Sequence, residues 1–503
     1  MKAEARRRYR PDLWILIACL LSAAHFAAFP AARHPLATDV RYFLYFAMRT
    51  AGGATPHLDL FDNKTQLATF AGSALFRLAQ VTGTEPLRVV RVGYVGFAAL
   101  AAVAAFLVHR RLWGRAGAGL LALSVQAGFT LLGLLPCIGN VPKMLTALLA
   151  TLACLLVDRQ RWTLAGVAGA LAFMDWQLGA LAILAALVAA LRSDPTRRAA
   201  VVARVILGAA LGLAPFLAWY ATRGALGAAF RQVVLASLYR GASTASRAGL
   251  LSDWPRRIDL VRSACPGEAW LVLIGVAGLA LYALVLRGPR ARAAGTDRLA
   301  TALAVYHYGI VVFSLWELQG YGDVFILLHS LAFFAAVALN MLWLGAERVA
   351  GGGRRVVGVL VWLALALAVS RPWIARGSLR LVAAPAGEGV TLDDQRALAP
   401  QIAARAAGRR VAFVGPAEQL YLGGGTNPLP FVYWNAATYA YYRESPAESS
   451  EATLVRLLDT AGVDVVVCDR GRTPLGASSS FPFAFTGTVA MPSGYGVDLY
   501  ERR

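Results

Sequence analysis

Charged residues are scarce in this chain. Only 15% of its 503 residues are Asp, Glu, Lys or Arg, and 58% are hydrophobic. A soluble globular domain usually has about 25% charged residues, so an ordinary soluble enzyme is excluded. Lysine is especially rare: only Lys2, Lys64 and Lys143 occur, and arginine therefore carries nearly all the positive charge.

Cysteine is too sparse to build the fold. The five cysteines include no CxxC pair, and none has a histidine at metal-ligand spacing. This pattern argues against a zinc site and against a disulfide scaffold.

Long apolar runs fill the first three quarters of the chain. A transmembrane helix needs about 20 mostly apolar residues to cross the hydrocarbon core. We expect about eleven such helices, over roughly 12–30, 88–108, 116–134, 142–157, 162–175, 178–191, 200–221, 269–286, 299–316, 323–345 and 356–371. Residues 162–191 allow one buried helix as an alternative, because Asp175, Trp176 and Gln177 interrupt the apolar stretch. The predicted fold class is an α-helical polytopic membrane protein.

Basic clusters occupy every second loop between these runs. They lie at 2–10, 110–115, 159–161, 192–198, 287–298 and 348–355. Short basic loops stay in the cytoplasm, so the pattern predicts a cytoplasmic N-terminus and an outer C-terminal segment. Most of the net charge of +21 is then a topology signal, and nucleic acid is not an expected partner.

The chain divides into two predicted domains. Residues 1–371 form the membrane domain, with long outer loops at 31–87 and 222–268, and residues 372–503 form a small extracytoplasmic α/β domain. In the second domain we expect a helix over 392–408, kinked or split at Pro400, and a strand at 410–414. A helix over 450–462, which could begin at Ser445, and a strand at 464–468 follow, as in a parallel α/β unit.

Titratable residues concentrate just after the first predicted helix. The stretch 37–70 holds Asp39, Arg41, Tyr42, Arg49, His57, Asp59, Asp62 and Lys64. A carboxylate at the end of a membrane helix has the character of a general base, while nearby Lys and Arg side chains suit a phosphate. The alternative is a solvated loop with ordinary surface charges.

This stretch resembles a known family. The pattern Asp39-x-Arg41-Tyr42, then Gly52-Gly53, Pro56, Asp59 and Asp62-Asn63-Lys64, is similar to the first extracytoplasmic loop of GT-C glycosyltransferases. More narrowly, it resembles the bacterial protein-mannosyltransferase-like branch. The resemblance implies a GT-C-like membrane domain in a bacterial inner (plasma) membrane and a polyprenyl-phosphate sugar as donor.

Individual roles follow from the same resemblance. Asp39 matches the catalytic acidic position, Lys64 matches the lysine near the lipid phosphate, and Tyr42 matches the aromatic after the acidic residue. Some relatives have two adjacent acidic residues, whereas Thr38 precedes Asp39 here, which puts a divalent cation such as Mg²⁺ or Mn²⁺ in doubt. The family lysine is followed by proline, but Lys64 is followed by Thr65-Gln66.

Two later segments supply further candidates. Gln319, Tyr321, Asp323 and His329 lie at a predicted outer helix end that faces the donor pocket in the family, although a buried histidine such as His329 is more often a core residue. Residues 224–240 predict an in-plane amphipathic helix, and outer arginines, among them Arg256 and Arg257, follow it. These arginines are candidates for the donor phosphate, or they serve as membrane anchors.

The expected function is therefore sugar transfer. An integral membrane glycosyltransferase would move a sugar from a polyprenyl-phosphate donor to a hydroxyl of a glycan, lipid or protein acceptor at the outer face, in contact with membrane lipids. Transfer would invert the anomeric centre in one displacement, with Asp39 as base. The alternatives are a transporter or lipid flippase, and a noncatalytic scaffold with an outer binding domain.

Overall fold

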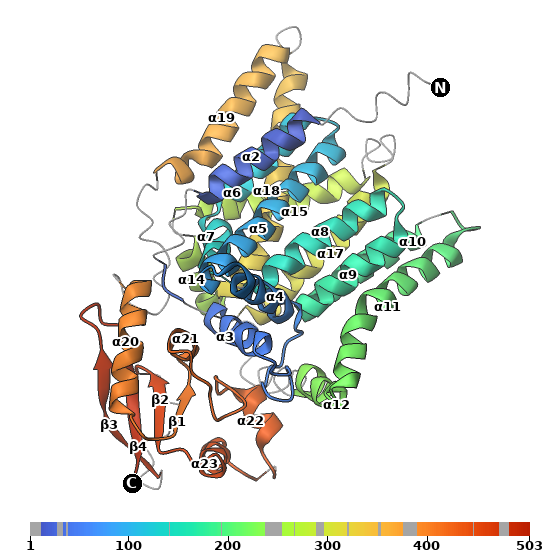
Figure 1. The fold of residues 1–503 in the computed structure, drawn as a ribbon. Helices are drawn as coiled ribbons and strands as arrows, with labels where there is room; N and C mark the ends of the chain where they lie inside the picture. The colour runs from blue at the N-terminus through green and yellow to red at the C-terminus, as the bar shows by residue number, and fades with distance from the viewer. Residues whose placement is uncertain are drawn as a thin grey trace.

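The computed structural model is a helical bundle with a small α/β domain at one end (Figure 1). It describes residues 12–27, 34–36, 39–139, 141–192, 194–236, 254–265, 267–287, 296–318, 321–350, 354–375, 390–445, 447–471 and 482–503. The helices of the bundle are α2 (Leu13–Ala27), α5 (Pro86–Trp113), α6 (Ala116–Gly128), α7 (Thr130–Ile138), α8 (Pro142–Asp158), α9 (Trp162–Asp175), α10 (Ala180–Leu191), α11 (Arg198–Thr222), α15 (Ala269–Arg287), α17 (Asp297–Glu317), α18 (Tyr321–Val349) and α19 (Arg354–Ala375).

In the described part of the chain, each predicted apolar run forms helix, and the chain is a multi-pass membrane protein. Among the described residues, five helices are long and apolar enough to cross a membrane, or six when the bent pair α6 and α7 counts as one span. The count of about eleven spans stays a prediction. Residues 162–191 form two helices, because Trp176 adopts an extended conformation after α9 and the short turn Gln177–Gly179 leads into α10.

Burial separates central from peripheral helices. An apolar 18-residue stretch of α18 is 94% buried, whereas the corresponding stretches of α11 and α15 are only 22% buried. Peripheral helices pack closely through glycine: a Cβ on Gly208 of α11 would overlap the carbonyl oxygen of Thr163 on α9, and one on Gly278 of α15 would overlap that of Phe334 on α18. The bundle core is therefore set by α18 and by close helix contacts around it.

Short helices line one end of the bundle. They are α3 (Val40–Ala51), α4 (Leu67–Thr82), α12 (Leu226–Phe230) with the π-helical turn Arg231–Leu235, and α14 (Trp254–Ala264). The predicted amphipathic helix over 224–240 is thus a short α-helix and one π turn as far as Ala236, and its later residues lie outside the described part.

The C-terminal domain is built on a four-stranded mixed sheet. Its strands are β1 (Val411–Val414), β2 (Val465–Asp469), β3 (Phe483–Ala490) and β4 (Gly496–Arg502), in the order β1-β2-β4-β3. The helices are α20 (Leu392–Arg405), α21 (Ala417–Leu422), α22 (Ala436–Tyr442) and α23 (Ser450–Thr460).

Local sequence explains several of these elements. β1 and β2 pair in parallel, as expected, with Val411 opposite Val465. The side chains of Thr391 and Asp394 form a capping box that begins α20, and the helix runs without a break through Pro400. Ser449, rather than Ser445, caps α23, because its side chain accepts a hydrogen bond from Ala452 N–H.

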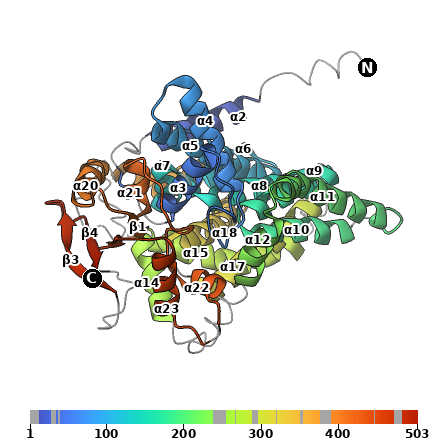
Figure 2. The ribbon, with the colours of Figure 1, turned by 60° about the horizontal axis from the view of Figure 1, so that its bottom comes forward.

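The C-terminal domain docks mainly on the short helices (Figures 1 and 2), and Arg396 of α20 also pairs with Glu85 at the start of α5. α21 packs against α3, and the backbone N–H of Phe61 donates to the carbonyl of Pro430. Phe61 is fully buried in the core of the C-terminal domain. The loop after α3 is therefore held between the two domains.

Candidate functional site

A polar cavity of about 390 Å³ lies where α3, the loop after it, the bundle and the C-terminal domain meet. Its lining combines five ionisable side chains other than tyrosine with aromatic rings. The lining residues are Asp39, Tyr42, Phe43, Phe46, Asp62, Asn63, Lys64, Lys143, Trp176, Phe313, Asp323, Tyr433, Trp434 and Asn435. Five of the predicted residues, Asp39, Tyr42, Asp62, Lys64 and Asp323, thus come together.

Asp39 and Lys64 form an ion pair in this cavity. Asp39 immediately precedes α3, and Lys64 Nζ donates to Asp39 Oδ2 at 3.1 Å. The Asp39 side chain is 48% exposed, so it is accessible to a ligand in the cavity. Burial acts to lower the pKa of the Lys64 ammonium, but neighbouring carboxylates, Asp39 first among them, hold that pKa above its ordinary value. Lys64 therefore stays charged.

A second ion pair comes from the bundle. Lys143, in the first turn of α8, donates to Asp323 Oδ1 of α18 at 2.5 Å. The Lys143 ammonium lies 4.8 Å from the centre of the Trp176 ring, much as Lys64 lies 5.0 Å from the centre of the Phe43 ring. The cavity thus contains two ammonium groups, each held by a carboxylate and an aromatic face.

Asp62 is the buried carboxyl of the cavity. It accepts hydrogen bonds from Gln66 Nε2 at 2.8 Å, from the Tyr433 hydroxyl at 3.1 Å and from Lys64 N–H at 3.1 Å. Burial raises the pKa of Asp62 to about 6, against the effect of these partners. Tyr433 also contacts Tyr42, with ring centres 5.0 Å apart, so the C-terminal domain closes one wall of the site.

Arg41 lies outside the cavity lining. Its guanidinium makes two parallel hydrogen bonds to Asp469, at 2.8 and 2.7 Å, and a salt bridge to Glu418 at 3.3 Å. The Tyr495 hydroxyl donates to Glu418 at 2.6 Å. Arg41 was predicted to bind phosphate. In the structure it instead binds two carboxylates of the C-terminal domain and so connects that domain to α3.

His57 and Asp59 shape the loop and do not line the cavity. His57 has a φ of 69° and pairs through Nδ1 with Gln232 Oε1 at 2.9 Å. Burial lowers the pKa of His57 to about 4, so the ring is neutral. The Asp59 carboxylate accepts from Thr55 N–H at 2.6 Å within its own turn. Both residues have structural partners here.

The predicted outer arginines are not part of the cavity lining. Arg256 and Arg257 lie on α14 and are not among the residues that line the cavity; Arg257 donates to the Leu315 carbonyl. Gln319 lies outside the described residues, as does the side chain of Tyr321, whose backbone begins α18.

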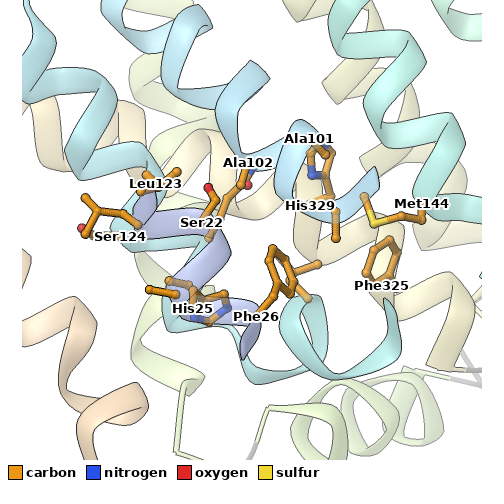
Figure 3. Close-up of a pocket in the computed structure, with 16 residues that line it drawn as sticks. Ser22, His25, Phe26, Ala101, Ala102, Leu123, Ser124, Met144, Phe325 and His329 are labelled. Carbon is orange, nitrogen blue, oxygen red and sulfur yellow. The ribbon is translucent and has the colours of Figure 1, made fainter. Parts of the chain in front are cut away.

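His329 belongs to a different, apolar cavity of about 140 Å³ (Figure 3). It lies among Phe26, Met144 and Phe325, between α2, α8 and α18. Its side chain is buried in the bundle, in agreement with a core histidine.

The described residues contain no cluster of three or more His, Cys, Asp or Glu side chains that could hold a metal ion. Within the cavity, Asp39 and Asp323 each already bind an ammonium group. The donor set therefore does not fit a cation site built from paired carboxylates.

Sequence reasoning missed Lys143, Trp176 and the segment 433–435 as site residues. One signal was available for Lys143: a lysine inside an apolar helix is costly and is a functional candidate by default. No local signal marks Tyr433, because its place in the site depends on how the two domains dock.

Solved structures identify the fold. The chain is similar over 97% of its length to ArnT from Cupriavidus metallidurans bound to undecaprenyl phosphate, covering 98% of that chain with 13% identity and a TM-score of 0.57. The oligosaccharyltransferase AglB from Archaeoglobus fulgidus, in complex with an inhibitory peptide and a dolichol-phosphate, matches 91% of this chain and 69% of its own, with 14% identity and a TM-score of 0.50.

A third match is arabinofuranosyltransferase AftD from Mycobacteria. It covers 98% of this chain and 40% of its own, with 16% identity and a TM-score of 0.51. No protein-family model and no curated protein sequence matches the chain. The expected GT-C fold is confirmed, while the protein-mannosyltransferase-like branch stays a prediction: the chain has the GT-C fold of membrane glycosyltransferases.

Proposed function

We propose that this protein is an integral membrane glycosyltransferase that moves a sugar from a polyprenyl-phosphate donor to an acceptor hydroxyl in the polar cavity. The observation that carries the proposal is the Asp39–Lys64 pair in a cavity of a GT-C fold. The ArnT structure is described as bound to undecaprenyl phosphate, and the AglB structure as a complex with dolichol-phosphate. Both compounds are lipid phosphates, which supports this class of donor.

The reaction is a single in-line displacement. The acceptor oxygen attacks the anomeric carbon of the donor sugar, its proton passes to the Asp39 carboxylate, and the bond from that carbon to the phosphate oxygen breaks. The leaving oxygen keeps the electron pair, and the Lys64 ammonium binds the phosphate through the negative charge that the donor already carries. The anomeric centre is inverted. Donor phosphate also draws Lys64 away from Asp39, which makes the carboxylate a stronger base.

The acceptor is a hydroxyl of a glycan, lipid or protein. A cavity walled by Tyr42, Tyr433 and Trp434 suits sugar rings, whose C–H faces pack on aromatic side chains. We further propose that the protein resides in a bacterial inner membrane with the cavity and the C-terminal domain on the outer side, since the basic loops lie at the other end of the predicted spans.

Sugar transfer in membranes from a radiolabelled polyprenyl-phosphate sugar tests the proposal. Asp39→Asn removes the base, and we expect kcat to fall about 100-fold to 10,000-fold, the usual contribution of a general base. Asp393→Asn is the matched control, because this carboxylate on α20 is 84% exposed and outside the cavity. Turnover near that of the unmodified protein in both Asp39→Asn and Lys64→Ala would overturn the assignment. Movement of the lipid without sugar transfer would favour a flippase.

A further inference from the structure

Lys143 has an unusual position for a charged residue. It is one of the three lysines of the chain, and only 5% of its surface is exposed. It follows Pro142 in the first turn of an apolar helix, and yet its ammonium lines the polar cavity. Removing an ammonium group from water carries a desolvation penalty that its ion pair has to offset. A purely structural contact between α8 and α18 could be made by apolar side chains at lower cost.

The Lys143 ammonium lies close to the proposed base. A Cβ placed on Gly322 would lie 3.1 Å from Lys143 Nζ and 3.8 Å from Asp39 Oδ2, so these two atoms are at most about 7 Å apart. Lys64 Nζ approaches the same Asp39 oxygen at 3.1 Å. A glycine at 322 keeps this space open. Small side-chain movements would bring both ammonium groups to one phosphate.

The charge of the donor changes during transfer. A polyprenyl-phosphate sugar is a phosphodiester with one negative charge. When the bond to the sugar breaks, the electron pair stays on the phosphate oxygen, and the product is a phosphate monoester with a charge of about −1.5 to −2 at pH 7. Because the proton of the acceptor goes to Asp39, it is not delivered to this oxygen. The site therefore has to compensate roughly one additional negative charge.

We infer that Lys143 is a second phosphate-binding residue, which compensates the charge that develops on the leaving phosphate, while Lys64 binds the charge already present in the donor. This inference rests on the proposed function and adds to it a residue that the resemblance does not assign. A group that interacts with charge formed only in the transition state raises kcat more than it lowers KM. Asp323 holds the ammonium until the phosphate takes it.

Two variants separate this role from a structural one. In Lys143→Met, Asp323 loses its ammonium partner, so the loss of a buried pair by itself could unfold the protein. The double variant Lys143→Met/Asp323→Asn removes both charges and leaves no uncompensated carboxylate. If Lys143 served only to pair with Asp323, the double variant would regain activity. If Lys143 binds the leaving phosphate, the double variant folds and stays slow.

A control ion pair lies at the other end of α18, the helix that carries Asp323. Glu347, also on α18, binds Arg115 at 2.6 Å and does not line the cavity. The variant Arg115→Met/Glu347→Gln therefore removes a more exposed ion pair of α18 without touching the site, and its kcat should stay within about twofold of the unmodified protein, since it leaves the transition state unchanged.

The experiment measures kcat, KM and the affinity for polyprenyl phosphate in detergent. We expect Lys143→Met/Asp323→Asn to lower kcat about 100-fold to 1,000-fold, the usual effect of losing one transition-state donor, with KM changed much less. Its affinity for polyprenyl phosphate should fall more than its affinity for the donor. An active double variant, or equal losses for product and donor, overturns the inference. If the unmodified protein transfers no sugar from a polyprenyl-phosphate donor, the proposed function itself fails, whatever the variants of Lys143 do.

Discussion

At the scale of single residues, Asp62 couples stability to pH. Its folded-state pKa of about 6 lies above the unfolded value, so the protonated carboxyl is favoured by folding. The resulting stabilisation is complete below about pH 4 and is lost as the pH rises through 6, because the buried carboxyl then ionises. We predict that the melting temperature of the unmodified protein falls relative to that of Asp62→Asn as the pH rises from about 4 to about 7.

The pH dependence, rather than the absolute stability, is the measurement that matters. Asparagine keeps an oxygen that accepts from Lys64 N–H and the Tyr433 hydroxyl, but its amide nitrogen cannot accept the hydrogen bond that Gln66 Nε2 donates to Asp62 Oδ2, so a constant offset is expected at every pH. Asp393→Asn, an exposed carboxyl on α20, should show no such trend. A difference that stays constant across this range would contradict the prediction.

Arg41 shows what residue patterns reveal about a site and what they do not. The density of charge in 37–64 predicted that a site lies there, and Asp39, Asp62 and Lys64 do line one cavity. Arg41 carries the same charge and lies two positions from Asp39, but its partners Glu418 and Asp469 are more than 370 positions away in sequence. No local pattern contains that pairing, because it depends on how the C-terminal domain docks on α3.

At the scale of elements, α9 and α11 depend on glycine for their close contact. Gly208 and Gly212 are four positions apart on α11 and face α9, where Gly166 in turn approaches the carbonyl of Val205. In a membrane, such small residues let backbones approach and gain dispersion contacts. We predict that Gly208→Ala lowers the free energy of unfolding by about 1–3 kcal/mol, because the added methyl forces the helices apart.

Melting temperatures in detergent test this prediction. Gly96→Ala on α5 is the control, since a Cβ there meets nothing within 4 Å. Alanine also favours helix by about 1 kcal/mol over glycine, so Gly96→Ala should be neutral or stabilising. An unchanged melting temperature for Gly208→Ala would show that the two helices adjust without cost.

Elements differ in how well the sequence predicts them. Apolar runs of sufficient length became helices, because a single segment satisfies its own backbone hydrogen bonds. The span expected over 116–134 instead ends at Gly128, and α7 leaves α6 at an angle of 67°. β3 and β4 were not predicted, although β4 pairs with both β2 and β3. Strand pairing and register depend on partners distant in sequence, so composition alone does not reveal them.

At the scale of the molecule, one end of the bundle carries everything that the proposed reaction needs. The charges of the cavity come from the loops around α3 and from the ends of α8 and α18, and the C-terminal domain closes the cavity with Tyr433, Trp434 and Asn435. The arrangement requires α3 and the C-terminal domain to lie on the same side of the membrane. The positions of the basic loops predict that this side is the outer one.

Cysteine labelling from outside tests that orientation. Asp393→Cys presents a thiol on α20 of the C-terminal domain, where the native side chain is 84% exposed, and Arg159→Cys presents one in the exposed turn between α8 and α9. We predict that a membrane-impermeant maleimide labels the first variant in intact cells and the second only after the membrane is opened. Of the native cysteines Cys137, Cys154, Cys265 and Cys468 are buried, so the unmodified protein reports the background from Cys19. The reverse labelling pattern would invert the topology and move the proposed reaction to the cytoplasmic face, where the basic loops could no longer be explained by the positive-inside rule.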